Sequence, residues 1–184
     1  MQKKKSLFRN TFILVSISAL AAVNIILSRV LRIDLGFARF TLGSLAPVMA
    51  GLWFGPAAGA LTGGIADVLG SFLSGYAPNP LITVGSVLWG VLPALMLPLV
   101  RGSRMRRMVM LSLLVILTSV VCTLGFTTAG LVMLGYDLMA IFPTRLAQFA
   151  AMTPVYCILV NCLYYSPVTA FVREHTRKIT QRES

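Results

Sequence analysis

The sequence predicts an all-α membrane protein whose six helices cross the bilayer. Of its 184 residues, 57% are hydrophobic and only 11% are charged. The mean hydropathy of +0.85 excludes an ordinary soluble domain. Several apolar runs approach the ~20 residues that a helix needs to cross the hydrocarbon core. These runs do not alternate apolar and polar residues as the strands of a membrane β-barrel would.

The first helix is expected at about residues 11–31, behind a basic start that contains Lys3, Lys4 and Lys5. The small residues Ala19 and Ala21 resemble a signal-peptide cleavage site, but the apolar run continues past them, so we expect a retained helix. Ser18 and Ala22 are four residues apart and predict a small-residue face suited to another helix, with exposure to lipid as the alternative.

The later apolar runs place the other helices of a single domain, residues 1–184. Gly55-Pro56 separates the second helix from the third, since glycine closes a helix and proline opens the next. Proline and glycine in residues 75–80 indicate a loop before the fourth. An arginine-rich segment precedes the fifth, and Gly135 to Pro143 connects it to the sixth. The five helices are expected at about 40–54, 56–73, 81–100, 108–134 and 144–172.

The basic residues predict the orientation in the membrane. Six helices bring both termini to one side, and that side receives 12 of the 16 basic residues. By the positive-inside rule, this side is cytoplasmic. The net charge of +11 is then explained by topology and by anionic lipid headgroups rather than by nucleic acid. The twelve are Lys3, Lys4, Lys5, Arg9, Arg101, Arg104, Arg106, Arg107, Arg173, Arg177, Lys178 and Arg182.

The remaining four arginines lie at the outer face and predict an anion site. The second, fourth and sixth helices begin there, and helix N-termini favour anions. Hydroxyl groups occur at these starts, among them Thr83, Ser86 and Thr144. Alternatively, the arginines reach lipid headgroups or pair with the few aspartates. The four are Arg29, Arg32, Arg39 and Arg145.

Asp67 is a carboxylate in an apolar surround, and intramembrane charges usually face a partner or a cavity. It could pair with Arg29, contact a ligand, or stay protonated in a structural role. Trp89, about two turns into the fourth helix, and Phe37, beside Arg39, are candidates for stacking on a planar ligand. Tyr76 and Tyr136 are interpreted as an interfacial aromatic belt.

The sequence offers no pattern for catalysis, a metal or a cofactor. His175 is the only histidine and lies in the basic tail, and the three cysteines show no CxxC spacing. Gly59 to Gly64 has P-loop spacing but lacks the Lys and Ser/Thr that must follow. We therefore expect a binding protein, not an enzyme, that depends on another subunit for energy.

The chain resembles the substrate-binding S components of energy-coupling factor (ECF) vitamin transporters, most closely the folate family. The resemblance covers about residues 19–95. It rests on Leu27-Ser28-Arg29, on Gly36-Phe37 and Arg39-Phe40, and on residues 50–60 (AGLWFGPAAGA) and 64–70 (GIADVLG).

The resemblance implies a multi-pass protein of a prokaryotic plasma membrane that captures a vitamin, most simply folate. Its partners would be a membrane T component and two cytoplasmic ATPases. Arg29 matches the family's arginine at the end of helix one. Ser18 and Ala22 match its small-residue contact with the T component, although serine replaces the usual alanine. Folate combines a planar pterin with a dicarboxylate tail, which suits arginines beside aromatic rings.

Two other functions stay open at this point. A self-contained secondary transporter or channel for a small organic anion would need coupling-ion ligands at mid-depth, and Asp67 is the single candidate. A structural membrane subunit without a ligand would tolerate loss of Arg29 and Arg145.

Overall fold

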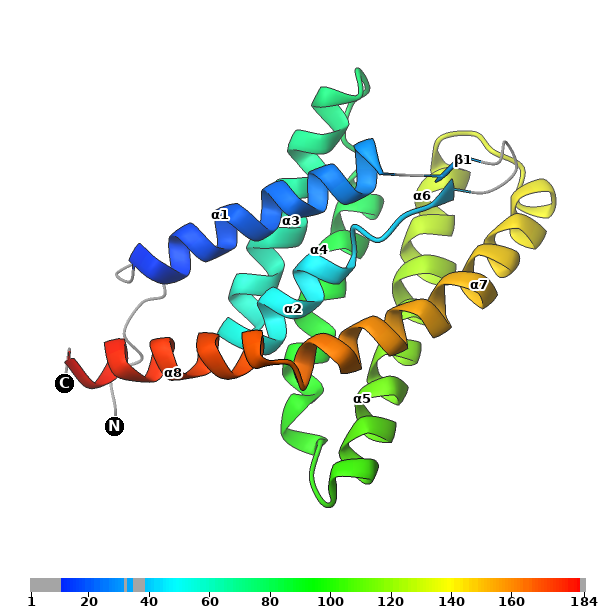
Figure 1. The fold of residues 1–184 in the computed structure, drawn as a ribbon. Helices are drawn as coiled ribbons and strands as arrows, with labels where there is room; N and C mark the ends of the chain where they lie inside the picture. The colour runs from blue at the N-terminus through cyan, green and yellow to red at the C-terminus, as the bar shows by residue number, and fades with distance from the viewer. Residues whose placement is uncertain (1–10, 32, 35–38, 183–184) are drawn as a thin grey trace.

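A computed structural model describes residues 11–31, 33–34 and 39–182 and shows an all-helical architecture with one very short strand pair (Figure 1). Strands β1 (Ile33–Asp34) and β2 (Arg39–Phe40) pair antiparallel. The helices are α1 (Thr11–Ile25), η2 (Ile26–Val30), α2 (Leu45–Phe54), α3 (Pro56–Leu73), α4 (Pro80–Met96), η3 (Leu97–Leu99), α5 (Arg104–Ser119), η4 (Val120–Thr127), α6 (Thr128–Met133), α7 (Leu138–Tyr164) and α8 (Pro167–Arg182).

Five helical segments of the described chain are long and apolar enough to cross a membrane: Thr11–Val30, Pro56–Leu73, Pro80–Leu99, Arg104–Met133 and Leu138–Tyr164. The apolar helix α2 has only 10 residues and is therefore about 15 Å long. The expected second helix from residue 40 is wrong at its start. Residue 40 pairs in β2, and a turn precedes Leu45.

The expected sixth helix, about residues 144–172, is wrong at both ends. The helix α7 begins at Leu138, where the side chain of Asp137 accepts a hydrogen bond from the backbone N–H of Met139 at 3.2 Å. It ends at Tyr164, and a separate helix, α8, starts at Pro167. The break follows from Pro167, because proline disfavours helical geometry at the residue before it.

The centre of the bundle is the contact between α3 and α4, where glycines allow backbone to touch backbone. A Cβ atom added at Gly59 would lie 2.5 Å from the carbonyl oxygen of Gly90. A Cβ atom at Gly63 would collide with the carbonyl oxygen of Ser86, and one at Gly51 with that of Gly90. Small residues therefore hold α2, α3 and α4 together by close packing, as the glycine spacing predicts.

The predicted turn at Gly55-Pro56 is confirmed. Gly55 has a φ of 97°, a left-handed conformation that glycine adopts without steric cost. Pro56 is the first residue of α3. This corner folds α2 directly back along α3, which brings the start of α2 to the same end of the bundle as the end of α3 (Figure 1).

The end of α8 lies near the start of α1, at the left of Figure 1. The Nε1–H of Trp53, at the end of α2, donates a hydrogen bond to Thr169 Oγ1 of α8 at 2.9 Å. The rings of Phe12 and His175 lie 5.2 Å apart. The helix α8 is therefore attached to the ends of α1 and α2.

Candidate ligand-binding site

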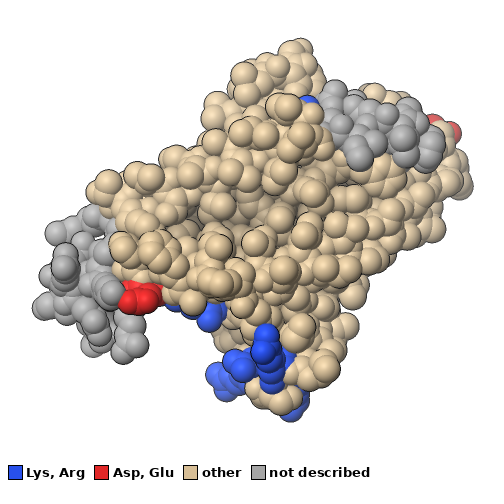
Figure 2. Space-filling model, in the orientation of Figure 1, with Lys and Arg blue, Asp and Glu red and all other residues tan. Residues whose placement is uncertain are grey.

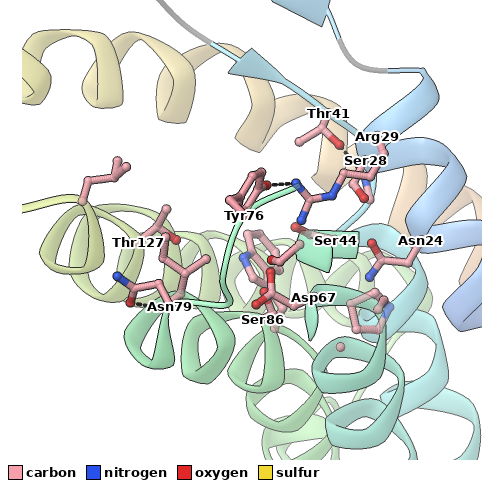
Figure 3. Close-up of a pocket in the computed structure, with 18 of the residues that line it drawn as sticks. Asn24, Ser28, Arg29, Thr41, Ser44, Asp67, Tyr76, Asn79, Ser86 and Thr127 are labelled. Atoms are coloured by element: carbon pink, nitrogen blue, oxygen red, sulfur yellow. Dashed lines mark hydrogen bonds between the residues drawn. The ribbon is translucent and has the colours of Figure 1, made fainter. Parts of the chain in front are cut away.

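A cavity of about 260 Å³ opens between α1, α3, α4 and α7, at the end of the bundle where α3 ends and α4 begins (Figure 3). Its lining is rich in hydroxyl and amide groups and contains three charged side chains, Arg29, Asp67 and Arg145. The other polar lining residues are Asn24, Ser28, Thr41, Ser44, Ser71, Tyr76, Asn79, Ser86, Thr127 and Gln148.

Arg29 lies in η2, a wide π-helical turn that ends the first membrane-crossing segment. Such turns are rare and occur often at functional sites. One Nη of Arg29 donates a hydrogen bond to the hydroxyl of Tyr76, and its guanidinium lies 5.3 Å from the Tyr76 ring centre (Figure 3). A Cβ atom at Gly70 would lie 2.8 Å from Arg29 Nε. The guanidinium is thus held between the loop after α3 and the glycine on that helix.

Asp67 projects from α3 toward the same cavity and is half-buried. Thr83 Oγ1, on α4, donates a hydrogen bond to Asp67 Oδ2 at 2.7 Å. The N-terminus of α4 is capped by Asn79, whose Oδ1 accepts from the backbone N–H of Leu81 at 2.9 Å. Thr83 itself does not line the cavity; it orients the carboxylate of Asp67 from behind.

Arg145 lies in α7, on a different wall of the cavity from Arg29. Its Nη1 donates a hydrogen bond to Gln148 Oε1, one turn further along the helix, at 2.8 Å. Two guanidinium groups from the first and the last membrane-crossing segments therefore line one space. Such groups bind carboxylates and phosphates with paired, charge-assisted hydrogen bonds.

A second cavity of about 150 Å³ continues from the first between α4, η4 and α7. Trp89 and Gln148 line both cavities. The Trp89 ring is buried and lies 5.2 Å from the ring of Tyr156, with an interplanar angle of 49°. None of the residues that line this inner cavity is charged. It offers hydroxyl groups and apolar surface, a suitable lining for an uncharged ring with polar edges. Its other lining residues are Thr41, Ser44, Ser86, Ser119, Thr123, Thr127, Phe149, Met152 and Tyr156.

Thr41 connects the segment after β2 to two helices at the mouth of both cavities. Its hydroxyl donates a hydrogen bond to the carbonyl of Leu27 at 3.1 Å. Its own carbonyl accepts one from the hydroxyl of Tyr156 at 2.5 Å. The segment after β2 is thereby attached to both η2 and α7, which carry residues of the cavity lining.

The structure brings together five of the eight site residues that the sequence indicated, and a sixth supports them. Arg29, Asp67, Ser86, Trp89 and Arg145 line the cavity, and Thr83 contacts Asp67. Phe37 lies outside the described residues, and so does the side chain of Arg39, whose backbone belongs to β2.

Tyr76, interpreted as a belt residue, also lines the cavity and contacts Arg29. One sequence interpretation of the outer face is wrong. Thr144 does not lie at a helix start: α7 begins at Leu138, and the Thr144 hydroxyl donates to the carbonyl of Ile141 at 2.6 Å. Asn24, Ser28 and Gln148 were missed, since uncharged polar residues in apolar helices carry no sequence signal of their own.

A comparison with models of known protein families identifies the family of this chain. The family model described as "ECF-type riboflavin transporter, S component" matches residues 9–169. The chain belongs to this family. It is therefore a component of a membrane transporter and not a member of an enzyme family. The suspected relation to ECF S components is confirmed at this level. No curated protein sequence matches the chain.

A solved structure shares the fold. The crystal structure of FolT bound with folic acid has a TM-score of 0.67, covering 84% of this chain and 93% of that chain at 23% sequence identity. Among the residues described for the present S component, no three His, Cys, Asp or Glu side chains lie together as metal ligands would.

Ser18 and Ala22 lie on the exposed side of α1. Their neighbour Ile17 is only 3% exposed and faces the bundle. The α1 helix of this S component thus presents small residues outward while its opposite side packs on α3.

Proposed function

We propose that this S component captures a vitamin with a planar ring and a carboxylate tail, with folate as the best candidate, at the outer face of a prokaryotic plasma membrane. Uptake would be driven by an ECF T component and two cytoplasmic ATPases. One observation carries the proposal: Arg29 and Arg145 line a cavity that continues into an uncharged, hydroxyl-rich one beside Trp89.

The charge of the cavity favours folate over riboflavin, although the family description names riboflavin. Riboflavin is uncharged at neutral pH and has no group that needs two guanidinium partners. Folate has two carboxylates at one end and a flat, hydrogen-bonding pterin at the other. The charged outer cavity and the uncharged inner cavity match this division, and the bound folic acid of FolT, a protein of the same fold, agrees with it.

The test is binding to the purified chain by isothermal titration calorimetry. We expect folate to bind tightly, pteroate, which lacks the glutamate carboxylates, more weakly, and riboflavin weakest. Replacing Arg29 or Arg145 by Ala should each cost ~1.5–3 kcal/mol for the loss of a hydrogen bond to a charged group. This corresponds to a loss of about 10- to 150-fold in affinity.

The matched control is Arg101→Ala, which removes the same charge from the exposed turn before α5, outside the cavity lining. It should bind folate as the parent chain does. If riboflavin binds more tightly than folate and neither cavity variant loses affinity, the carboxylate assignment is wrong while family membership stands.

A further inference from the structure

Two adjacent tyrosines at the junction of α7 and α8 each hold an arginine. The ring centres of Tyr164 and Tyr165 lie 5.3 Å apart at an interplanar angle of 85°. The guanidinium carbon of Arg173, on α8, lies 4.7 Å from the Tyr164 ring centre. That of Arg104, at the start of α5, lies 5.5 Å from the Tyr165 ring centre. Three helices therefore contribute to one cluster of two rings and two cations.

Stacking fixes a guanidinium without using its N–H groups. Cation–π contacts engage the flat face of the cation, so its donors remain in the plane, directed outward. Arg104 and Arg173 are both exposed. Neither guanidinium donates a hydrogen bond to another group within the described part of the chain. The N–H donors of these two fixed guanidinium groups therefore face outward at the junction of α7 and α8.

The charge around the cluster is almost entirely positive. Arg101, Arg106 and Arg107 are also exposed in the turn before α5 and in its first turn. Figure 2 shows Lys and Arg side chains gathered at the lower end of the molecule, and Asp and Glu side chains in two small patches, one toward the left and one at the upper right. Glu174, next to Arg173, is the one acidic residue in the described part of α8. Arginines in a first helical turn also repel the positive end of that helix. An external anion would relieve both effects.

Apolar side chains surround the cluster and remain uncovered. On the α8 side these are Val168 and Phe171, 50% and 60% exposed. On the α4–α5 side they are Leu99 and Met105, 58% and 72% exposed. Tyr164 of the cluster is also the last residue of a segment long enough to cross a membrane. Basic residues beside exposed apolar ones at this level are typical of helices that lie in the membrane interface.

We propose that Arg104 and Arg173, held on Tyr165 and Tyr164, form a binding site for the phosphate group of an anionic phospholipid. The apolar residues around the cluster would contact the acyl chains of that lipid. Clusters of basic residues immediately beside a membrane-crossing helix bind anionic headgroups in this way. The ligand cavity lies at the other end of the bundle, so this site is independent of the vitamin.

The test is native mass spectrometry of the full chain purified in mild detergent with equal amounts of phosphatidylglycerol and phosphatidylcholine. We expect the parent chain to retain one phosphatidylglycerol. Arg104→Gln with Arg173→Gln should reduce the retained fraction about tenfold, whereas the control pair Arg101→Gln with Arg107→Gln, of identical net charge, should change it less than twofold. Equal loss in both pairs would mean that only bulk charge matters, and this would overturn the site.

The tyrosines give a second readout that does not remove charge. Tyr165→Phe keeps the ring, and its buried hydroxyl has no hydrogen-bond partner within the described residues, so lipid retention should be unchanged. Tyr165→Leu removes the stacking and should weaken retention severalfold. Equal retention by both variants would overturn the role of stacking.

Displacement of the lipid by millimolar inorganic phosphate would overturn the choice of a lipid over a free anion. Unchanged retention in the Arg104/Arg173 pair with loss of coupled uptake would assign the cluster to a protein partner.

Discussion

Gly70 illustrates how one residue without a side chain orients a charged one. The space beside its Cα is occupied by the Arg29 guanidinium, at 2.8 Å from the position of a Cβ atom. Tyr76 contacts the same guanidinium from the loop after α3. The direction of Arg29 is therefore determined by a glycine that contacts no ligand, and the Asp67 carboxylate is oriented in the same indirect way by Thr83.

Gly70→Ala should weaken folate binding while leaving the fold intact. The added methyl group meets the far end of a flexible side chain, so Arg29 moves away and loses its contact with Tyr76. We expect a loss of about tenfold in affinity, comparable with removing part of a charged hydrogen bond. Calorimetric titration measures the affinity, and thermal unfolding measures the fold.

The control for this variant is Gly64→Ala on the same helix, where the nearest atom to an added Cβ is a methyl of Val87 at 3.2 Å. Its affinity should be unchanged. If both variants bind alike, Gly70 has no positioning role.

At the scale of elements, two groups of helices pack through different kinds of contact. The contacts among α2, α3 and α4 depend on glycines at backbone distance. The contact between α5 and α7 combines buried apolar side chains, among them Leu111, Val115 and Val160, with polar ones. Ser119 and Thr153 share a hydrogen bond of 2.9 Å, and Asn161 Nδ2 donates to Ser112 Oγ at 2.9 Å. Polar contacts of this kind contribute modestly to helix association inside membranes. We therefore expect the contact between α3 and α4 to be the more stable one.

Gly90→Ala should destabilise the protein by about 3 kcal/mol, because an added methyl group would collide with the backbone of Gly59 and force the helices apart. Reversible unfolding in detergent, followed by circular dichroism, measures the change. Gly125→Ala is the matched control, since nothing lies within 4 Å of its Cβ position. Similar stability of the two variants would contradict the close-packing argument.

Replacing Ser18 and Ala22 by Leu should abolish coupled uptake without changing vitamin affinity. Both residues are exposed on α1, and leucine would prevent close approach of a partner helix. The measurement is folate uptake into vesicles that also contain the T component and the ATPases. Val15→Leu is the control, since Val15 is a large exposed residue on the same helix (62% exposed). Normal uptake by the double variant would refute the predicted contact.

The lengths of apolar runs were sufficient to predict most elements but not their junctions. The predictions of about 56–73 and 81–100 lie close to α3 and to α4 with η3. The break before Pro167 was missed because apolar residues continue on both sides of it, and hydropathy does not register one proline. The charged residues of the cavity were recognisable because charge is rare in a membrane. The contact of Tyr76 with Arg29 was missed because an interfacial ring has the same sequence signature as one that holds an arginine.

At the scale of the whole molecule, charge is sorted between the two ends of the bundle. The exposed arginines at the turn before α5 lie at the end of the bundle that holds the α7–α8 junction, where Arg104 contacts Tyr165. Arg29 and Arg145 lie at the cavity end. The positive-inside rule then orients the cavity outward. This orientation is a prediction, as is the count of six crossings, because α2 is too short to span by itself.

A green fluorescent protein fused after Ser184 should fluoresce in bacterial cells, since that reporter folds only in the cytoplasm. Alkaline phosphatase inserted after Gly75, in the loop between α3 and α4, should be active, since it requires the outer side. The reverse fusions at each position serve as controls. The opposite pattern at both sites would invert the topology and move the cavity to the inner face.

The glycine contact between α3 and α4 also limits how this protein can be adapted to a new cargo. Gly63 lines the outer cavity, and a larger side chain there would collide with the backbone of Ser86, so this part of the cavity wall cannot be reshaped by substitution. The lining of the inner cavity contains no glycine and includes Phe149 and Met152 of α7, which have no such restriction. A mutant library designed to retarget uptake should therefore vary α7 and leave the glycines untouched.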